Sequence, residues 1–228
     1  MKNICDIYEE YFDKTKHEMD LAITNSDVPR NALTLLNAMD LYKEKKIPET
    51  LEYNSQAGSI EDTSIIRQRI IPIVGFPLLS HEWIKPLAQW IGKRKVLEVM
   101  AGCGSLTYCL KQYDIDIIAT DNFTWKSNKW ECWTDIENID CIDAIKKYND
   151  RKIVICSWAY MDNTAYRILL ELRKTNSLLI YIGEDKWGCT ADDDFFDNMK
   201  VIDDPEFKKA SDKYKHYVSL HDYLALIK

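Results

Sequence analysis

The chain has 228 residues, 46% of them hydrophobic and 29% charged, which is enough for one globular domain with a modest extension. A formal charge of −7 argues against a surface built to hold nucleic-acid phosphates. The hydrophobic content excludes a disordered chain, and no apolar run reaches the length of a membrane span. The first residues include acids where a secretory signal has an apolar core, and the seven cysteines form no C-x-x-C pair. We therefore expect a cytoplasmic protein with reduced thiols, no metal site, and no membrane or nucleic-acid partner.

The N-terminal part of the chain has a helical pattern. Over residues 4–46 the apolar side chains recur at three- and four-residue spacings, which predicts two helices. Pro48 and the polar stretch after it end this pattern. We interpret residues 1–60 as an N-terminal helical extension and residues 61–228 as the main domain.

The main domain has a different periodicity. Residues 63–79 are apolar but contain two arginines, two prolines and a glycine, so we expect no long regular element there. Ser80 is a candidate N-cap of a helix that Pro86 delays or kinks. Short apolar runs then alternate with helix-compatible segments, which is typical of parallel βαβ units. These runs are 96–99, 115–119, 153–156 and 178–182, with 216–220 and 223–227 as candidates for the last strands. The sequence predicts an α/β fold with a Rossmann-like, mostly parallel twisted sheet and helices on both faces.

The most informative stretch runs from Lys95 to Thr107, where a strand is followed by a tight turn that contains Gly102 and Gly104. Two glycines at a strand-to-helix junction let the backbone approach a ligand closely, because no Cβ stands between them. The next strand leads to Asp121, 17 residues beyond Gly104, where a carboxylate can bind both hydroxyls of a ribose. A strand-end Asp can also only cap a turn, but together with the glycine loop it favours a nucleoside ligand.

The loop does not match the patterns that bind pyrophosphate. Thr107 stands where a dinucleotide fingerprint has its third glycine, and the P-loop pattern with its lysine is missing. S-adenosylmethionine carries no phosphate but has a sulfonium cation and an α-amino group. An acid such as Glu98 behind the loop suits this cofactor better than a pyrophosphate.

The stretch Glu98–Gly104 resembles the first motif of the class I S-adenosylmethionine-dependent methyltransferases, roughly acid-x-G-x-G-x-G, with Met100 in place of the first glycine. The resemblance covers about residues 80–228 and implies transfer of a methyl group from S-adenosylmethionine to a small molecule or a protein side chain. It implies that Asp121 binds the ribose, and that Asp143 and Ala144, the pair after the third strand of the family fold, contact adenine. The candidate cofactor-binding residues are Arg67, Glu98, Met100, Ala101, Gly102, Gly104, Asp121, Asn122, Asp143, Ala144, Ser157 and Trp158.

Two residues are candidates for catalysis. In this family the residues after the fourth strand, which corresponds to residues 153–156 here, face the methyl group. This implies that Tyr160 aligns or deprotonates an acceptor. The loop that ends in Tyr160 resembles the Asn-Pro-Pro-Tyr loop of amino-group methyltransferases but differs at three of four positions, so this specificity is not carried over. Glu184, just past the predicted strand at residues 178–182, is the other candidate. The structural alternatives are a pocket wall for Tyr160 and a solvated turn acid for Glu184.

Other features leave alternatives open. Arg67 lies in a segment that in many methyltransferases folds over the cofactor, where it could bind the methionine carboxylate; a surface salt bridge is the alternative. Five tryptophans follow predicted strands and could line an acceptor pocket or fill the core: Trp125, Trp130, Trp133, Trp158 and Trp187. The rival functions are a non-catalytic S-adenosylmethionine-binding module and a nicotinamide-dependent oxidoreductase, which Thr107 disfavours. The sequence does not indicate an oligomeric state.

Overall fold

The computed structural model describes residues 27–55, 60–124, 131–218 and 220–228. A six-stranded sheet lies at its centre, with the strand order β3-β2-β1-β4-β5-β6. All neighbouring pairs are parallel except β5 and β6, which are antiparallel. The strands are β1 (Val96–Val99), β2 (Ile117–Asp121), β3 (Ile136–Asn138), β4 (Ile153–Ser157), β5 (Leu178–Gly183) and β6 (Tyr223–Ile227). This topology confirms the predicted Rossmann-like α/β fold and places the reversal of strand order between β1 and β4.

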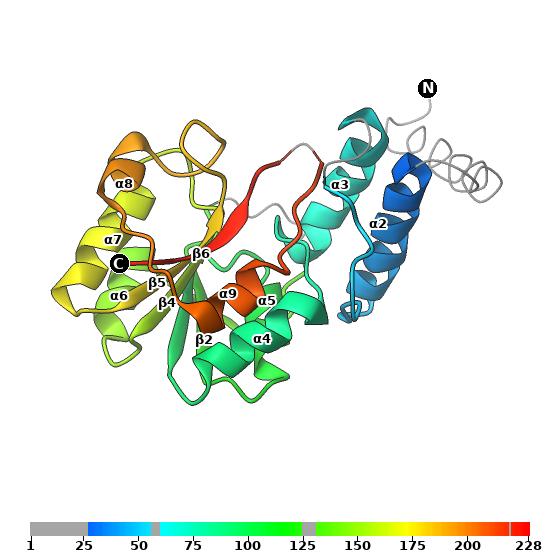
Figure 1. The fold of residues 1–228 in the computed structure, drawn as a ribbon. Coiled ribbons are helices and arrows are strands. Elements are labelled where there is room, and N and C mark those ends of the chain that lie inside the picture. The colour runs from blue at the N-terminus through cyan, green and yellow to red at the C-terminus, as the bar shows by residue number, and fades with distance from the viewer. Residues whose placement is uncertain (1–26, 56–59, 125–130, 219) are drawn as a thin grey trace, which may run out of the picture.

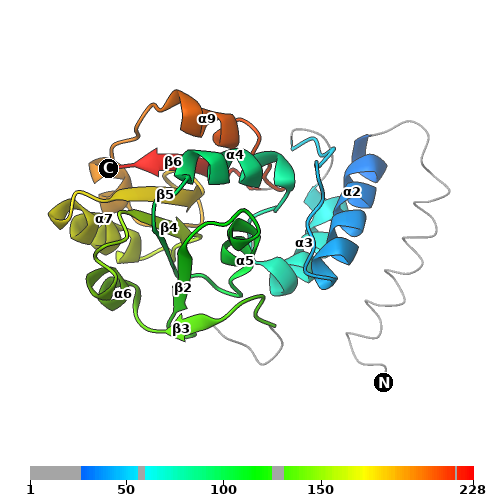
Figure 2. The ribbon, with the colours of Figure 1, turned by 90° about the horizontal axis from the view of Figure 1, so that it is seen from below.

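Helices cover both faces of the sheet, as Figure 1 and Figure 2 show. Successive strand residues alternate between two hydrophobic clusters, so that Val96 faces one cluster and Leu97 the other. The first cluster includes side chains of α4 (His81–Ile91), α5 (Ser105–Lys111) and α9 (Pro205–Ser211). The second includes side chains of α6 (Cys141–Lys147), α7 (Thr164–Lys174) and α8 (Asp193–Asn198).

Helix α3 (Ile60–Val74) contradicts the prediction that residues 63–79 contain no long regular element. Its buried side chains recur every fourth residue, at Ile66, Ile70 and Val74. Pro72 lies in the last turn, and its missing N–H removes one helical hydrogen bond. The prediction was wrong because apolar spacing, rather than the presence of a proline, decided the structure.

The N-terminal extension is described from helix α2 (Asp27–Lys43) onward, and the first of the two predicted helices lies outside the described residues. Helix α2 packs against α3, and Tyr42 donates a buried hydrogen bond to the carbonyl of Leu79 (2.6 Å). Buried α2 side chains belong to the same hydrophobic cluster as one face of the sheet. The division at residue 60 stays a prediction, and this position is the first residue of α3.

Smaller differences concern the ends of elements. Strand β2 ends at Asp121, two residues later than predicted, and the half-exposed β3 was missing from the list of predicted runs. Of the two C-terminal candidates, residues 223–227 form a strand, whereas the described residues of 216–220 do not. Ser80 occupies the N-cap position of α4 as predicted, although its hydroxyl makes no capping hydrogen bond, and α4 continues through Pro86.

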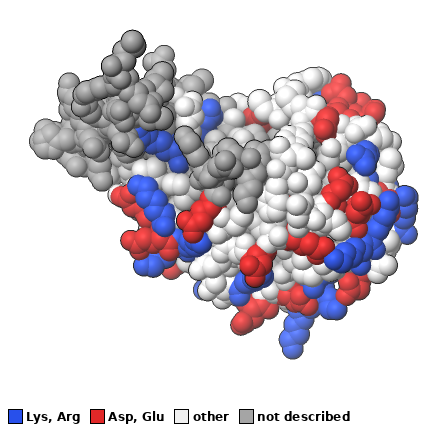
Figure 3. All heavy atoms as spheres, turned by 180° about the vertical axis from the view of Figure 1, so that it is seen from behind, with Lys and Arg blue, Asp and Glu red and all other residues white. Residues whose placement is uncertain are grey.

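Among the described residues visible in Figure 3, acidic and basic side chains are interspersed. No helix in the described part of the chain combines the length and the apolar character needed to cross a membrane.

Candidate functional site

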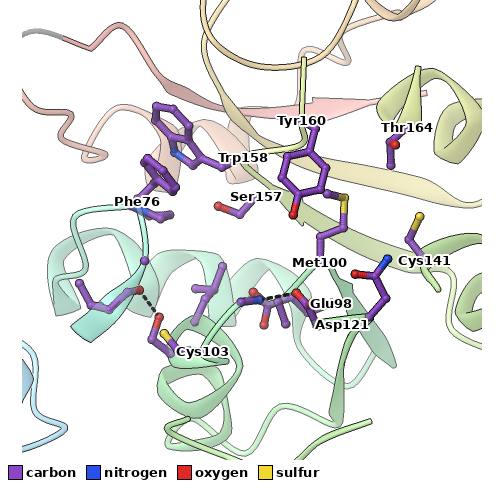
Figure 4. Close-up of a pocket in the computed structure, with 18 of the residues that line it drawn as sticks. Phe76, Glu98, Met100, Cys103, Asp121, Cys141, Ser157, Trp158, Tyr160 and Thr164 are labelled. Carbon is purple, nitrogen blue, oxygen red and sulfur yellow. Dashed lines mark hydrogen bonds between the residues drawn. The ribbon is translucent and has the colours of Figure 1, made fainter. Parts of the chain in front are cut away.

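A cavity of about 370 Å³ lies at the carboxyl ends of β1, β2 and β4, where the strand order changes direction. Figure 4 shows its walls, which come from the glycine loop, the ends of β2 and β4, the start of α6 and the segment after α3. The volume is within the range of small-molecule and cofactor sites. The lining residues are Val74, Gly75, Phe76, Pro77, Glu98, Met100, Ala101, Gly102, Cys103, Ser105, Leu106, Asp121, Asn122, Asp140, Cys141, Ser157, Trp158, Tyr160 and Thr164.

The two glycines of the loop have different surroundings. Both have a left-handed backbone, with φ of +60° at Gly102 and +71° at Gly104. A Cβ added to Gly102, which lines the cavity, would meet no atom within 4 Å. A Cβ on Gly104 would lie 2.9 Å from Thr134 and 3.1 Å from Ile136. Gly102 therefore leaves space in the cavity, whereas Gly104 does not line the cavity and permits close packing of the loop against β3.

Met100, which stands where the family motif has its first glycine, also has a left-handed backbone, with φ of +54°. This conformation is uncommon for a residue with a side chain and is favoured by glycine. The loop thus retains the backbone that a glycine would adopt, while the Met100 side chain becomes part of the cavity wall.

Asp121 is the last residue of β2 and is held in place by two backbone N–H groups. Its Oδ2 accepts a hydrogen bond from Gly102 (2.8 Å), and its Oδ1 accepts one from Phe123 (2.7 Å). The side chain is buried but lines the cavity beside Asn122. Asp121 therefore caps the turn after β2 and also fixes the glycine loop, whereas its contact with a ribose stays a prediction.

Glu98 is 2% exposed and lies beneath the glycine loop. Its Oε2 accepts hydrogen bonds from the Thr107 backbone N–H (3.0 Å) and from the Thr107 hydroxyl. Burial raises the pKa of Glu98 to about 7, against the opposing effect of these hydrogen bonds. Thr107, which replaces the third glycine of a dinucleotide fingerprint, thus anchors an acid under the site.

The charge of the cavity is one-sided. Its described lining residues include three carboxylic acids, Glu98, Asp121 and Asp140, and no lysine, arginine or histidine. The negative C-terminal end of α3 reaches the cavity wall at Val74, and the positive N-terminal ends of α5 and α6 reach it at Ser105 and Cys141, so the excess of negative charge comes from the side chains. The electrostatic environment therefore favours a cationic ligand and disfavours a pyrophosphate.

Side chains near the glycine loop hold the end of α3. The carbonyl of Ile73 accepts hydrogen bonds from the Trp133 indole (2.7 Å) and the Cys103 thiol (3.6 Å), and that of Val74 accepts one from the Ser105 hydroxyl (2.6 Å; Figure 4). Carbonyls at a helix C-terminus lack partners within the helix, so these bonds satisfy them. They join α3 to the loop and fix residues 75–77 beside the cavity.

The residues after β4 form an aromatic wall. Trp158 stacks on Phe76 with ring centroids 4.3 Å apart, and Tyr160 lines the same cavity while 43% exposed. Trp158 has a left-handed backbone, with φ of +56°. The Ser157 hydroxyl and the Trp158 indole N–H are buried and have no hydrogen-bond partner among the described residues. Such a wall presents aromatic side chains to a ligand, whereas the two unpartnered donors have almost no accessible surface.

The structure does not place the predicted adenine pair in the cavity. Asp143 is exposed beside Lys146, with 3.9 Å between the charged atoms, and Ala144 is buried in the core between α6 and the sheet. Asp140 and Cys141, three residues earlier, line the cavity instead. Asp140 is the N-cap of α6 and accepts the N–H of Ile142 (2.9 Å). A capping pattern with Asp140 as the N-cap was the signal that could have located the pair that lines the cavity.

Glu184 and Arg67 also lie outside the described cavity lining. The Glu184 carboxylate is buried, not solvated, and accepts backbone hydrogen bonds from Cys189 (2.6 Å) and His221 (3.1 Å). Burial raises its pKa, but these hydrogen bonds outweigh burial and the pKa is lowered. Arg67, on α3, acts electrostatically on Cys189 and on Tyr217, away from the glycine loop. Both residues belong to a polar region beyond β5.

The tryptophans have separate environments. Trp158 lines the cavity, Trp133 is buried against Tyr108, and Trp187 is 89% exposed. Trp125 and Trp130 lie outside the described residues. Of the five candidate tryptophans, three are described, and of these only Trp158 forms part of the cavity wall.

Comparisons with known proteins assign no family. No family model and no curated protein matches the chain. Among solved structures, 29 chains match. One of them, titled as the crystal structure of a mutant of MtNAS, has a TM-score of 0.40 and 8% sequence identity, covering 94% of this chain and 76% of its own. A likeness at this level carries no argument about function, which must come from the cavity.

Proposed function

We propose that this chain binds S-adenosylmethionine in the cavity and transfers its methyl group to a small molecule or a protein side chain. The observation that carries the proposal is an anionic cavity at the switch point of a Rossmann-like sheet, with Asp121 bonded to the glycine loop. The phosphates of a nicotinamide dinucleotide would meet three acids and no basic side chain among the described lining residues. A sulfonium and an ammonium group suit the same surroundings.

Each part of the lining has a role in this proposal. Asp121 accepts hydrogen bonds from the ribose hydroxyls, and Gly102 leaves room for the ligand. Asp140 and Cys141 take the adenine side in place of the pair predicted from the sequence. Glu98 supplies negative charge on the methionine side.

S-adenosylmethionine, when bound, supplies a methyl group that is already activated by the sulfonium. The protein must then orient the acceptor and keep water away. Trp158 and Phe76 provide an apolar wall for this purpose, and Tyr160 is placed to orient an acceptor or receive its proton. Glu184 lies outside the described lining, so we assign it a structural role in joining the loop after β5 to the segment before β6.

The experiment is titration calorimetry with S-adenosylmethionine, S-adenosylhomocysteine and NADH, each added to the full-length protein. We expect binding of the first two and none of NADH. Binding of NADH alone, or of none of the three, would refute the proposed cofactor.

The alternative is a non-catalytic S-adenosylmethionine-binding module. It is favoured by Tyr160, whose hydroxyl makes no hydrogen bond to the described residues and is therefore not activated by a neighbour. Incubation with isotope-labelled S-adenosylmethionine and a cell extract separates the two functions. Label in an acceptor supports the enzyme, whereas tight binding without any transfer supports the module.

A further inference from the structure

Several exposed apolar side chains lie on the cavity wall or in the loops that follow β4 and β5. Six large hydrophobic residues in the described part of the chain are exposed. Two of them, Phe76 and Tyr160, line the cavity, and Met161 and Trp187 belong to the loops after β4 and β5. We call these four the mouth patch. The other two, Leu170 on α7 and Val201 between α8 and α9, lie outside these loops.

The two loops that carry the mouth patch are joined to each other. The Trp158 N–H donates to the carbonyl of Ile182 (2.7 Å), and the Ala191 N–H donates to that of Ala159 (3.4 Å). Trp187 therefore lies in the loop after β5, and the end of this strand is hydrogen-bonded to Trp158 of the cavity wall. Its backbone is left-handed, with φ of +73°, and its ring is 89% exposed. An exposed tryptophan in this setting is typical of an interaction surface.

Several acidic residues are close to the mouth patch in the sequence. Asp162 lies next to Met161, Asp185 lies two residues before Trp187, and Asp193 and Asp194 begin the following helix. None of these four carboxylates forms an ion pair with a described residue, whereas the one lysine of this loop, Lys186, is paired with Asp197. Together with the acids in the cavity, these charges complement a basic partner.

We propose that the mouth patch docks a basic polypeptide segment and that the methyl acceptor is a lysine side chain of that segment. The inference rests on the proposed function and names its substrate class. A small acceptor could be covered by the cavity alone, but Met161 (68% exposed) and Trp187 lie outside the described cavity lining. A polypeptide is long enough to cover both while one of its side chains enters the cavity.

A lysine suits the wall that it would meet. Its aliphatic stem packs along the Phe76 and Tyr160 rings, and its ammonium group is attracted by aromatic faces and by the carboxylates. The ammonium first gives up its proton through the partly exposed Tyr160 hydroxyl, which passes a proton on to water outside the cavity. The free amine then forms one N–C bond to the methyl carbon as the S–C bond breaks, the electron pair stays on sulfur, and the product is a secondary ammonium.

The test uses a fluorescent 15-residue peptide of alternating lysine and leucine, a matched peptide with glutamate in place of lysine, and free spermidine. Peptide binding is measured by anisotropy with and without S-adenosylhomocysteine, and lysine methylation by mass spectrometry. Trp187→Ser and Met161→Ser are the test variants, and Leu170→Ser and Val201→Ser are matched controls that also remove an exposed apolar side chain.

We expect the lysine peptide to bind and the glutamate peptide not to bind, with affinity falling as salt rises. Trp187→Ser should weaken peptide binding about tenfold, the controls less than twofold, and no variant should alter S-adenosylmethionine binding. Equal effects of test and control variants, or methylation of spermidine without the peptide, would overturn the inference while leaving the proposed cofactor intact. Failure of the wild-type protein to bind S-adenosylmethionine would instead remove the proposed function on which it rests.

Discussion

Replacing Glu98 by glutamine should change how the stability of the fold depends on pH. Glu98 is buried, and burial raises its pKa from the ordinary 4.5 to about 7. In the unfolded chain the carboxyl ionises at lower pH than in the folded protein. Its contribution to stability is therefore fully present below pH 4.5 and is lost as the pH rises through 7.

The magnitude follows from the size of this shift. One pKa unit corresponds to about 1.4 kcal/mol, so the shift from 4.5 to about 7 corresponds to about 3 kcal/mol lost by the wild type above pH 7. The glutamine side chain of the variant cannot ionise, and its carbonyl oxygen can accept the same two hydrogen bonds from Thr107. The free energy of unfolding of Glu98→Gln, relative to that of the wild type, should therefore be highest at high pH.

The assay is urea denaturation of wild type and Glu98→Gln at pH 5 and pH 8, with Glu206→Gln, an exposed carboxyl on α9, as the control. The difference in unfolding free energy between Glu98→Gln and wild type should rise by about 2 to 3 kcal/mol from pH 5 to pH 8. The control should show almost no such change. If the two variants behave alike, Glu98 ionises as an ordinary carboxyl and the electrostatic account of the cavity is wrong.

The remaining predictions concern the cavity and its supports. A cationic ligand beside Glu98 should lower the pKa of this carboxyl, so that binding releases a proton and S-adenosylmethionine binds more tightly at pH 8 than at pH 6. Calorimetry at the two pH values measures the affinity, and calorimetry in buffers of different ionisation enthalpy measures the proton release; a pH-independent affinity would contradict this. Asp121→Ala should weaken S-adenosylmethionine binding by roughly 1.5–3 kcal/mol in calorimetry, and unchanged affinity would exclude Asp121 as a ligand contact. Gly102→Ala should weaken S-adenosylmethionine binding about tenfold and lower the free energy of unfolding by about 1 kcal/mol. Gly104→Ala should lower the free energy of unfolding by at least about 2 kcal/mol in urea denaturation, and a larger stability loss for Gly102→Ala than for Gly104→Ala would reject the assigned roles. Ser105→Ala removes a hydrogen bond to the end of α3 and should lower stability by about 1 kcal/mol, with no loss expected if that bond does not hold the helix.

Local sequence patterns determined the architecture of this protein. The short apolar runs identified β1, β4 and β5, because strands buried on both faces need apolar side chains at every position. The residues between them had to cross over as helices, which made the sheet parallel. The same reasoning located the glycine loop and the acid at the end of β2. Strand β3, with only three residues and partial exposure, gave no comparable signal.

Only the tertiary structure decided which of the candidate residues share a cavity. Gly102 and Gly104 look equivalent in the sequence, but one faces open space and the other faces the side chains of Thr134 and Ile136. Asp143 was a reasonable candidate by position, yet the rotation of α6 points it to solvent and leaves Asp140 at the cavity.

The segment after α3 shows the same limit. The family resemblance suggested that the segment of Arg67 folds over the cofactor, but it did not indicate that residues 75–77, rather than Arg67, line the cavity. Their position depends on hydrogen bonds from Cys103, Ser105 and Trp133 to the end of α3. A sequence pattern reports which face of one element is buried. Contacts between elements far apart in the chain depend on how all the elements pack, and this packing formed the anionic, aromatic-walled cavity from which the function is proposed.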